Sequence, residues 1–381
     1  MKRSLLFTVV SSMLAAVVGL AAHGAAAGTV ASAGADEDVG HAVFVQTDDP
    51  AGNAVVVYDR GADGTLSEAA SYPTGGRGGI LAGSVVDHLA SQGSLVYDSA
   101  HRLLYAVNAG SNTVSVFAVH GDRLSLGQVV GSGGVFPVSI AVHGNDVEVL
   151  NALDGGSVDS FVVVLGHLLP LPGSNRPLAL DPSATPQFTT TPGQVVFTPD
   201  GTKLVVTTKA NGNDVDVFRV GPLGYLSSAP VVNPEPGTVP FALDFDPSGD
   251  LVLAEAGTNA LASFRLVRDG TIGLLEAVPT GQAATCWITG IGGHFYASNA
   301  GSGTISRYDW SPGGHLTLLG ATPTDPGTVD SAASPDGRFL YVQTGASGVV
   351  DAFEVGTDGS LTEIGSTTVP DAVGSEGIAA S

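Results

Sequence analysis

The chain has 381 residues, with 36 acidic side chains against 14 basic ones, and its formal net charge is −22 at pH 7. So large a negative charge argues against nucleic acid and anionic membrane surfaces as partners, because both are themselves negatively charged. A single cysteine, Cys286, excludes an internal disulfide framework. Stability must therefore come from the hydrophobic core that a chain of this length can bury.

The N-terminus has the three parts of a secretory signal. Lys2 and Arg3 supply positive charge, residues 5–22 are mainly apolar, and the alanines that follow offer a cleavage site. We therefore predict a signal peptide over residues 1–27, a flexible leader over residues 28–40, and a secreted, extracellular protein with no membrane contact after cleavage. An uncleaved anchor is the alternative, although the apolar run is short for a membrane span.

Residues 41–381 repeat one template: an apolar strand, a Gly/Asn turn, and an alternating strand that ends in an aromatic residue. These seven aromatic residues are Tyr58, Phe117, Phe161, Phe218, Phe264, Tyr308 and Phe353. Their spacing centres on the mid-forties, which is a typical period for one propeller blade. Further strands before and after most units give four antiparallel strands per unit. The sequence therefore predicts a single all-β domain over residues 41–381, a seven-bladed β-propeller.

The two ends of this domain complement each other. The first repeat lacks its opening strand, whereas the chain ends in "SEGIAAS", which resembles an opening strand with nothing after it. We predict that residues 377–380 pair into the first blade and close the ring, because closure removes an exposed sheet edge. A frayed tail is the alternative.

The stretch "SPDGRFLYVQT", followed by "VVDAFEV", resembles the seven-bladed lactonase-type propellers. That family includes bacterial phosphogluconolactonases and fungal carboxymuconate cyclases, and it is related to the YVTN-type surface propellers. The resemblance covers residues 41–381. It implies the propeller fold and, as an activity, hydrolysis of lactones, which are cyclic carboxylic esters. Because one fold serves many functions, it leaves open whether this chain is an enzyme.

Several polar residues are expected at one mouth of the central channel. In an antiparallel blade, the turn between the second and third strands lies on the same face as the connection that enters the next blade. Polar groups that converge in such a concave place are typical of a binding site. The second-to-third turns supply Lys209, Glu255 and Asn299, and the connections supply Gln194, Trp287, Asp330 and Glu376.

An irregular segment, residues 71–94, enters the second blade on the same face and carries Arg77 and His88. Its Gly-rich start predicts a mobile flap that takes part in the site. Trp287 offers a ring that either stacks on a sugar or fills the channel. Its neighbour Cys286 is expected to be a small buried hydrophobe.

The resemblance implies catalytic positions that this sequence does not keep. Lactonase-type relatives tend to have an Arg-His pair entering a middle blade and a Glu in the following turn. Here Gly193 and Gln194 stand at the pair, and Lys209 stands at the Glu. The preceding blade has Val138 where relatives have His. These departures count against the usual lactone-opening arrangement.

Lys209 is one of only two lysines after the predicted signal, and Glu255 occupies the equivalent position one blade later. Either an ion pair between them or a role in ligand binding explains the pair. The leading hypothesis is a secreted propeller that binds a small polar or carbohydrate-like molecule, such as a cell-envelope carbohydrate, at the channel mouth. The alternative is an extracellular lactonase with Glu255 as general base and with Lys209 and Arg77 stabilising the oxyanion. A protein-interaction platform is a third possibility.

No cofactor is predicted, and the protein is expected to be a monomer. The histidines lack the paired spacing that is typical of zinc sites. Asp48, Asp49, Glu255, Asp330 and Glu376 are oxygen ligands near the mouth, so a divalent cation there is left open.

Overall fold

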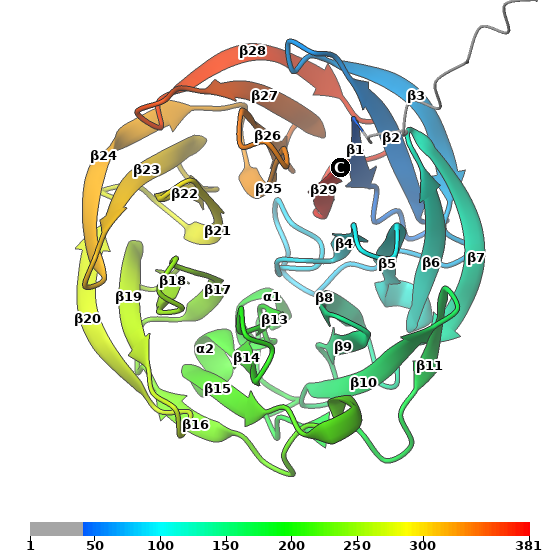
Figure 1. Cartoon of the computed structure of the whole chain (residues 1–381), viewed down its shortest axis with the longest axis vertical. Coiled ribbons are helices and arrows are strands. Elements are labelled where there is room, and N and C mark those ends of the chain that lie inside the picture. Colours follow the sequence, from blue (N-terminus) through cyan, green and yellow to red (C-terminus); the bar gives the residue numbers. More distant parts are fainter. Residues whose placement is uncertain (1–40) are drawn as a thin grey trace, which may run out of the picture. The chain divides into compact units, whose positions relative to one another are not determined.

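A computed structural model describes residues 41–381. They form seven antiparallel sheets around a central channel, which confirms the prediction of a seven-bladed β-propeller (Figure 1). The predicted signal peptide and leader lie outside the described residues. Within residues 41–381, no helix is long and apolar enough to cross a membrane.

Each blade has an innermost strand that lines the channel and a second strand beside it. In order from blade 1 to blade 7, the innermost strands are β29 (Ile378–Ala380), β4 (Leu95–Asp98), β8 (Pro137–His143), β13 (Val195–Phe197), β17 (Pro240–Phe245), β21 (Thr285–Ile291) and β25 (Thr328–Ala333). The second strands are β1 (Ala42–Gln46), β5 (Leu103–Asn108), β9 (Asp146–Asn151), β14 (Lys203–Thr207), β18 (Leu251–Glu255), β22 (His294–Asn299) and β26 (Phe339–Thr344).

The third and outer strands complete the blades. The third strands are β2 (Ala54–Arg60), β6 (Thr113–His120), β10 (Ser157–Val164), β15 (Asp214–Arg219), β19 (Ala260–Leu266), β23 (Thr304–Ser311) and β27 (Val349–Val355). The outer strands are β3 (Leu66–Pro73), β7 (Arg123–Gly131), β11 (His167–Pro170) with the short β12 (Arg176–Pro177), β16 (Val231–Pro234), β20 (Ile272–Pro279), β24 (His315–Pro323) and β28 (Leu361–Thr368).

The helical elements within residues 41–381 are single turns. They are α1 (Gln187–Thr190), α2 (Lys209–Gly212), η1 (Ala109–Ser111) and η2 (Pro222–Gly224). We call the face that carries the second-to-third turns the plug face. The opposite face, which carries the first-to-second and third-to-fourth turns, is the far face.

The end of the chain closes the ring, as predicted. β29 pairs antiparallel with β1, with Val43 opposite Ala380 and Val45 opposite Ile378. The blade formed by β29, β1, β2 and β3 therefore joins the first and last parts of the domain (Figure 1). Closure leaves no innermost strand missing, so no sheet edge is exposed at the joint.

The repeated aromatic residue explains the period of the sequence. All seven of these side chains are at most 1% exposed. Phe117, for example, packs in one cluster with Phe44 and Val55 of the preceding blade. Each aromatic therefore fills the space between adjacent blades, where burying a large ring is most favourable.

Candidate functional site

The mouth on the plug face is filled by the chain itself. After β3 the chain runs into the centre of the ring before it enters β4, and Figure 1 shows this loop in cyan. We call residues 86–93 of this loop the plug. Its backbone meets blade 6 where the indole Nε1 of Trp287 donates to the carbonyl oxygen of Ser91 over 2.6 Å.

Gln92 connects the plug to three blades. Its side chain exchanges two hydrogen bonds with the backbone of Ile288 in blade 6, one accepted over 3.0 Å and one donated over 2.8 Å. Its backbone N–H donates to Gly193 of blade 4 over 3.1 Å. The hydroxyl of Ser139 in blade 3 donates to its carbonyl over 2.6 Å. Because these partners lie on different sides of the channel, Gln92 holds the plug across it.

The buried carboxyl group of Glu376 binds the plug from blade 1. Oε1 of Glu376 accepts from the Ser91 hydroxyl over 2.7 Å, and Oε2 accepts from the Ser91 backbone N–H over 3.3 Å. The backbone N–H of Glu376 in turn donates to Oδ2 of Asp48 over 2.9 Å. Burial raises the pKa of Glu376 well above its usual range and raises that of Asp48 to about 7. These acids are thus shielded from water and neighbour one another.

Lys209 binds the plug from blade 4. Its side chain is fully buried, and Nζ donates to the carbonyl oxygens of Ala90 over 2.5 Å and Phe188 over 2.8 Å. The same nitrogen lies 5.2 Å from the ring centre of Phe241, within range of a cation–π contact. Burial lowers the pKa of Lys209, and the negative charge of Asp87 in the plug opposes that shift. The backbone of Lys209 has φ 51°, a left-handed conformation that costs about 1 kcal/mol in a residue with a side chain.

A cavity of about 420 Å³ lies in the channel below the plug. It extends from Gln92 and Gly93 of the plug to His143, Thr198 and Pro199, beside the first-to-second turns of the far face. Two of the residues predicted from the sequence, Gln194 and Asp330, line it together with Ser331.

The side chains of Gln194 and Asp330 in this channel cavity are held in place by backbone groups. Oδ1 of Asp330 accepts from the N–H of Ser331 over 2.9 Å, and burial raises the pKa of Asp330 to about 7. Oε1 of Gln194 accepts from the N–H of Leu243 over 2.7 Å. For Nε2 of Gln194 there is no hydrogen-bond partner among residues 41–381. The cavity therefore presents a side-chain amide donor and a carboxyl group that titrates near neutral pH.

Comparison with known proteins identifies the family. Residues 82–375 match the family model described as lactonase, seven-bladed β-propeller. The chain belongs to this lactonase family. Among curated proteins, no significant match to the sequence is found.

Solved structures of similar shape have low sequence identity to this lactonase-family chain. The periplasmic gluconolactonase of Pseudomonas aeruginosa is 20% identical with a TM-score of 0.68, and the alignment covers 88% of this chain and 97% of that one. A protein from Lactobacillus plantarum is 20% identical with a TM-score of 0.69, over 89% and 98% of the two chains. A candidate 6-phosphogluconolactonase from Bacteroides fragilis is 20% identical with a TM-score of 0.66, over 88% and 96%. At this identity the likeness shows the shared fold.

The proposed catalytic pair of this lactonase-family chain is not brought together. Among residues 41–381, no nitrogen-to-oxygen distance within 4.0 Å joins Lys209 to Glu255. Oε2 of Glu255 instead accepts from the Thr258 hydroxyl over 2.8 Å, and burial raises its pKa. Lys209 would reach a ligand only after the plug withdrew. The ion pair considered from the sequence is therefore absent, and a catalytic role of the two residues stays a hypothesis.

The segment predicted to be a mobile flap packs differently. Leu81, Leu89 and Ser91 are fully buried, so the segment fills the mouth instead of covering an open site. Arg77 lies on its exposed part, where its side chain donates to the carbonyl of Gly110 over 3.4 Å. The glycines at its start let the backbone approach neighbouring chain segments closely. A Gly-rich sequence is equally typical of a flexible loop, so the sequence alone does not distinguish the two cases.

The other predicted residues have mainly internal partners. Asn299 is buried, accepts from the hydroxyl of Thr285 over 2.6 Å and donates to that of Ser306 over 2.9 Å, so it supports its own turn. The backbone N–H of His88 donates to Gly374 over 2.6 Å, and burial lowers the pKa of its ring. Burial raises the pKa of Cys286 to about 12, in keeping with an unreactive buried thiol.

The sequence did not single out Gln92 or Asp87, although both are central to the plug. Oδ1 of Asp87 accepts from the N–H of Leu89 over 2.9 Å, and burial raises its pKa to about 6.

Within residues 41–381 no group of three or more His, Cys, Asp or Glu side chains is arranged to hold a metal ion. The acids near the channel bind backbone N–H groups, and this chemistry leaves no trace in residue spacing.

Proposed function

We propose that this lactonase-family propeller binds a small polar, carbohydrate-like molecule in the channel cavity, reached from the far face. The observation that carries the proposal is the 420 Å³ cavity lined by both Gln194 and Asp330. Its volume lies in the range of small-molecule sites and is ample for one sugar ring.

The chemistry of the lining supports a ligand with hydroxyl groups. Nε2 of Gln194 is a donor without a protein partner, and the carboxyl group of Asp330 accepts when ionised and can donate when protonated. A sugar hydroxyl both donates and accepts, so it satisfies both groups. The mouth on the plug face, where the sequence places the site, is already occupied by Gln92 and its neighbours. Approach from the far face follows from that occupation.

The binding test uses calorimetric titration with a panel of monosaccharides, aldonates and aldonolactones. Gln194→Glu keeps the acceptor for the Leu243 N–H but replaces the amide donor, so it should weaken binding about tenfold, the value of one lost hydrogen bond to a polar ligand. Asp330→Asn keeps the acceptor for Ser331 and should change both affinity and its pH dependence. Gln282→Leu, outside the cavity, is the control. No saturable binding by any compound, or equal affinity in all variants, would refute the proposal.

One observation favours a second candidate, hydrolysis of a lactone in the same cavity. A carboxyl group whose pKa lies near 7 is well suited to act as a general base that removes a proton from water, and Asp330 meets this description. Proton release from aldono- and muconolactones above the spontaneous rate would establish the activity. Loss of that activity in Asp330→Asn supports Asp330 as the base, whereas loss in Glu255→Gln alone supports the set predicted from the sequence.

We also propose that the protein is exported, on the basis of the N-terminal residues 1–27. The mature protein would then begin after Ala27. N-terminal sequencing of protein from the culture medium tests this. Retention in the cell with residues 1–27 intact would contradict it.

A further inference from the structure

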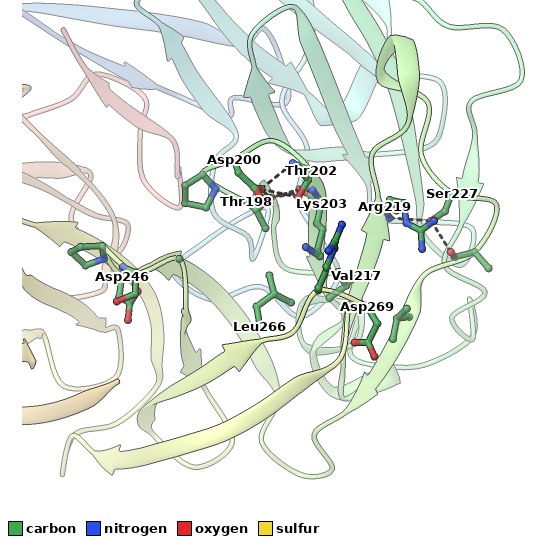
Figure 2. A pocket seen from close by; sticks show the side chains of 18 residues that line it. Thr198, Asp200, Thr202, Lys203, Val217, Arg219, Ser227, Asp246, Leu266 and Asp269 are labelled. Atoms are coloured by element: carbon green, nitrogen blue, oxygen red, sulfur yellow. Dashed lines mark hydrogen bonds between the residues drawn. The ribbon is translucent and has the colours of Figure 1, made fainter. Parts of the chain in front are cut away.

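A second, larger hollow of about 1350 Å³ lies between blades 4 and 5 on the far face (Figure 2). Its walls come from the first-to-second turns of both blades, from β15, and from the third-to-fourth turn of blade 5. We call it the interblade hollow. It includes neither Gln194 nor Asp330, so it is a separate place from the channel cavity.

The hollow exists because the outer strand of blade 4 is short. β16 has four residues, and it pairs with β15 only from Asp214 to Val217. In blade 5 the corresponding pairing continues to the end of the third strand, where Leu266 lies opposite Ile272. The last part of β15 is met only by residues 225–227, through a bridge between Val220 and Leu226 and a hydrogen bond of 2.8 Å from the Ser227 N–H to the carbonyl oxygen of Arg219. The regular outer strand begins again only at Val231, and the hollow opens beside this interruption, where Ser227 and Ala229 line it.

Basic side chains gather in this space. Lys203 of β14 and Arg219 of β15 are directly opposite each other in the sheet, so their side chains leave the same face. Arg268 lies on the blade 5 side. Figure 2 shows Lys203 and Arg219 on one wall, with Leu266 and Asp269 across from them. Three of the 12 lysines and arginines that follow the predicted signal thus line one hollow.

These cations are not neutralised by a direct ion pair. Among residues 41–381, no carboxylate oxygen lies within 4.0 Å of the side-chain nitrogens of Lys203, Arg219 or Arg268. Like charges placed directly opposite each other in a sheet are destabilising. The charge of Lys203 contributes to lowering the pKa of Asp200 and of Asp269 from beyond ion-pair distance, so these acids offset part of the repulsion. A bound oxyanion in direct contact with the cations would offset more of it.

Three acidic residues also line the hollow, but each is committed to its own turn. Oδ1 of Asp200 accepts from the hydroxyls of Thr198 over 2.7 Å and Thr202 over 2.9 Å. Oδ1 of Asp269 accepts from the N–H of Thr271 over 3.0 Å, and Oδ1 of Asp246 accepts from two N–H groups of its own turn. Each of these carboxylates thus has one oxygen bound within its own turn, while Oδ2 of Asp246 is buried without a partner. The side-chain N–H donors of the three cations make no hydrogen bond within residues 41–381.

We propose that the interblade hollow binds the oxyanion group of a small anionic molecule through Lys203, Arg219 and Arg268. Phosphate, sulfate and carboxylate share the chemistry that these donors recognise, because guanidinium groups and ammonium groups bind oxyanions by charge-assisted hydrogen bonds. A ligand that carries such a group would find it here, on a surface that is otherwise strongly acidic.

The hollow adjoins the channel cavity, because Thr198 and Pro199 line both. A molecule with a sugar-like part and an oxyanion would therefore meet both sites on the far face. The anion site itself does not depend on the channel cavity, since it shares neither of the two residues on which the proposed function rests.

The test titrates the mature protein with inorganic phosphate, sulfate and acetate at constant ionic strength, with chloride as the balancing anion, and follows binding by calorimetry. We expect saturable binding. The double variant Lys203→Met/Arg219→Gln and the single variant Arg268→Gln should each weaken it about fivefold or more, the upper range for an exposed ion pair. Preference among the three anions shows which oxyanion the site takes.

Arg123→Gln is the control, because it removes one positive charge from a side chain that is 83% exposed and lies in blade 2. It should leave anion affinity unchanged. The Lys203→Met/Arg219→Gln variant should unfold at nearly the same temperature as the wild type, because neither side chain forms an ion pair within 4.0 Å among residues 41–381, so its loss of binding would not come from misfolding. Absence of saturable binding for all three anions, or equal affinity in wild type and hollow variants, would overturn the proposal.

Discussion

Nζ of Lys209 donates a hydrogen bond of 2.5 Å to the carbonyl oxygen of Ala90, 119 residues earlier in the chain. This contact joins blade 4 to the plug at the centre of the ring. It gives a structural reason for a buried lysine in a chain that has few lysines. At the position where relatives tend to have an acidic catalytic residue, this protein uses a cation to hold its own backbone.

Replacing Lys209 by methionine should therefore destabilise the fold. The change removes the donor that Nζ provides to the carbonyls of Ala90 and Phe188, and it removes the positive charge that opposes the upward pKa shift of Asp87. We expect a loss of about 2–4 kcal/mol in the free energy of unfolding, measured by urea denaturation. Lys203→Met removes the same charge from a half-buried surface position and should cost about 0.5 kcal/mol or less. Equal effects of the two substitutions would contradict the role given to Lys209.

The acids behind the plug should make stability depend on pH. Burial raises the pKa of Asp48 and Asp330 from their ordinary 3.8 to about 7 each, and raises that of Glu376 above 4.5. Between these limits the folded protein binds more protons than the unfolded chain, so the free energy of unfolding falls as pH rises from about 4 to about 7. Below about pH 4 these acids are protonated in both states, so their contribution to the free energy of unfolding no longer changes with pH and has its most favourable value.

Glu376→Gln isolates this effect from the general repulsion of an acidic protein. Glutamine can still accept from the Ser91 N–H, and its amide can donate to the Ser91 hydroxyl, so the contacts are retained without a titrating group. Urea denaturation at a series of pH values should give a shallower slope for this variant and greater stability than the wild type at pH 8. A slope as steep as that of the wild type would show that Glu376 does not contribute to the pH dependence of the free energy of unfolding.

A glycine in blade 7 offers a way to push the plug without removing a polar contact. A Cβ atom on Gly345 would lie 1.7 Å from the carbonyl oxygen of Val86, at the start of the plug. Gly345→Ala should therefore displace Val86 and speed limited proteolysis within residues 82–92. Gly52→Ala, at a position with no atom within 4 Å of the added carbon, is the control and should leave the cleavage rate unchanged.

Trp287 should report on the plug by fluorescence. In a Trp310→Phe background it is the sole tryptophan, and it lies buried against Phe241 with its indole N–H bonded to Ser91. We expect blue-shifted emission that resists a soluble quencher in the otherwise native protein. Adding Lys209→Met should shift the emission towards the red and increase quenching. Emission typical of an exposed indole before that second change would contradict a closed plug.

The blade count, the four-stranded blades and the closure by the C-terminal strand could all be predicted from the sequence. Each depends on local signals, such as the buried aromatic of the third strand, that repeat along the chain. Repetition makes such signals visible because one blade packs like the next.

The site could be predicted only in part. Gln194 and Asp330 line one cavity, but this cavity lies below the plug and not at the mouth where the sequence analysis expected them. The plug could not be foreseen, because it depends on contacts such as Gln92 to Ile288, 196 residues apart, between an irregular loop and strand backbones. A side chain that binds a backbone group can do so at a residue of any type. Neither the spacing nor the composition of the sequence therefore reveals such a contact.

Amide hydrogen exchange of the wild-type protein tests the closed plug most directly. The N–H groups of Ser91 and Gln92 are bonded to Glu376 and to the carbonyl of Gly193. The structure predicts that they exchange as slowly as amides of the innermost strands, because opening them requires the plug to leave the channel. Exchange as fast as in the exposed turn at Ser99 and Ala100 would mean that the plug is open in solution, and the mouth on its face would again be the place to look for a ligand.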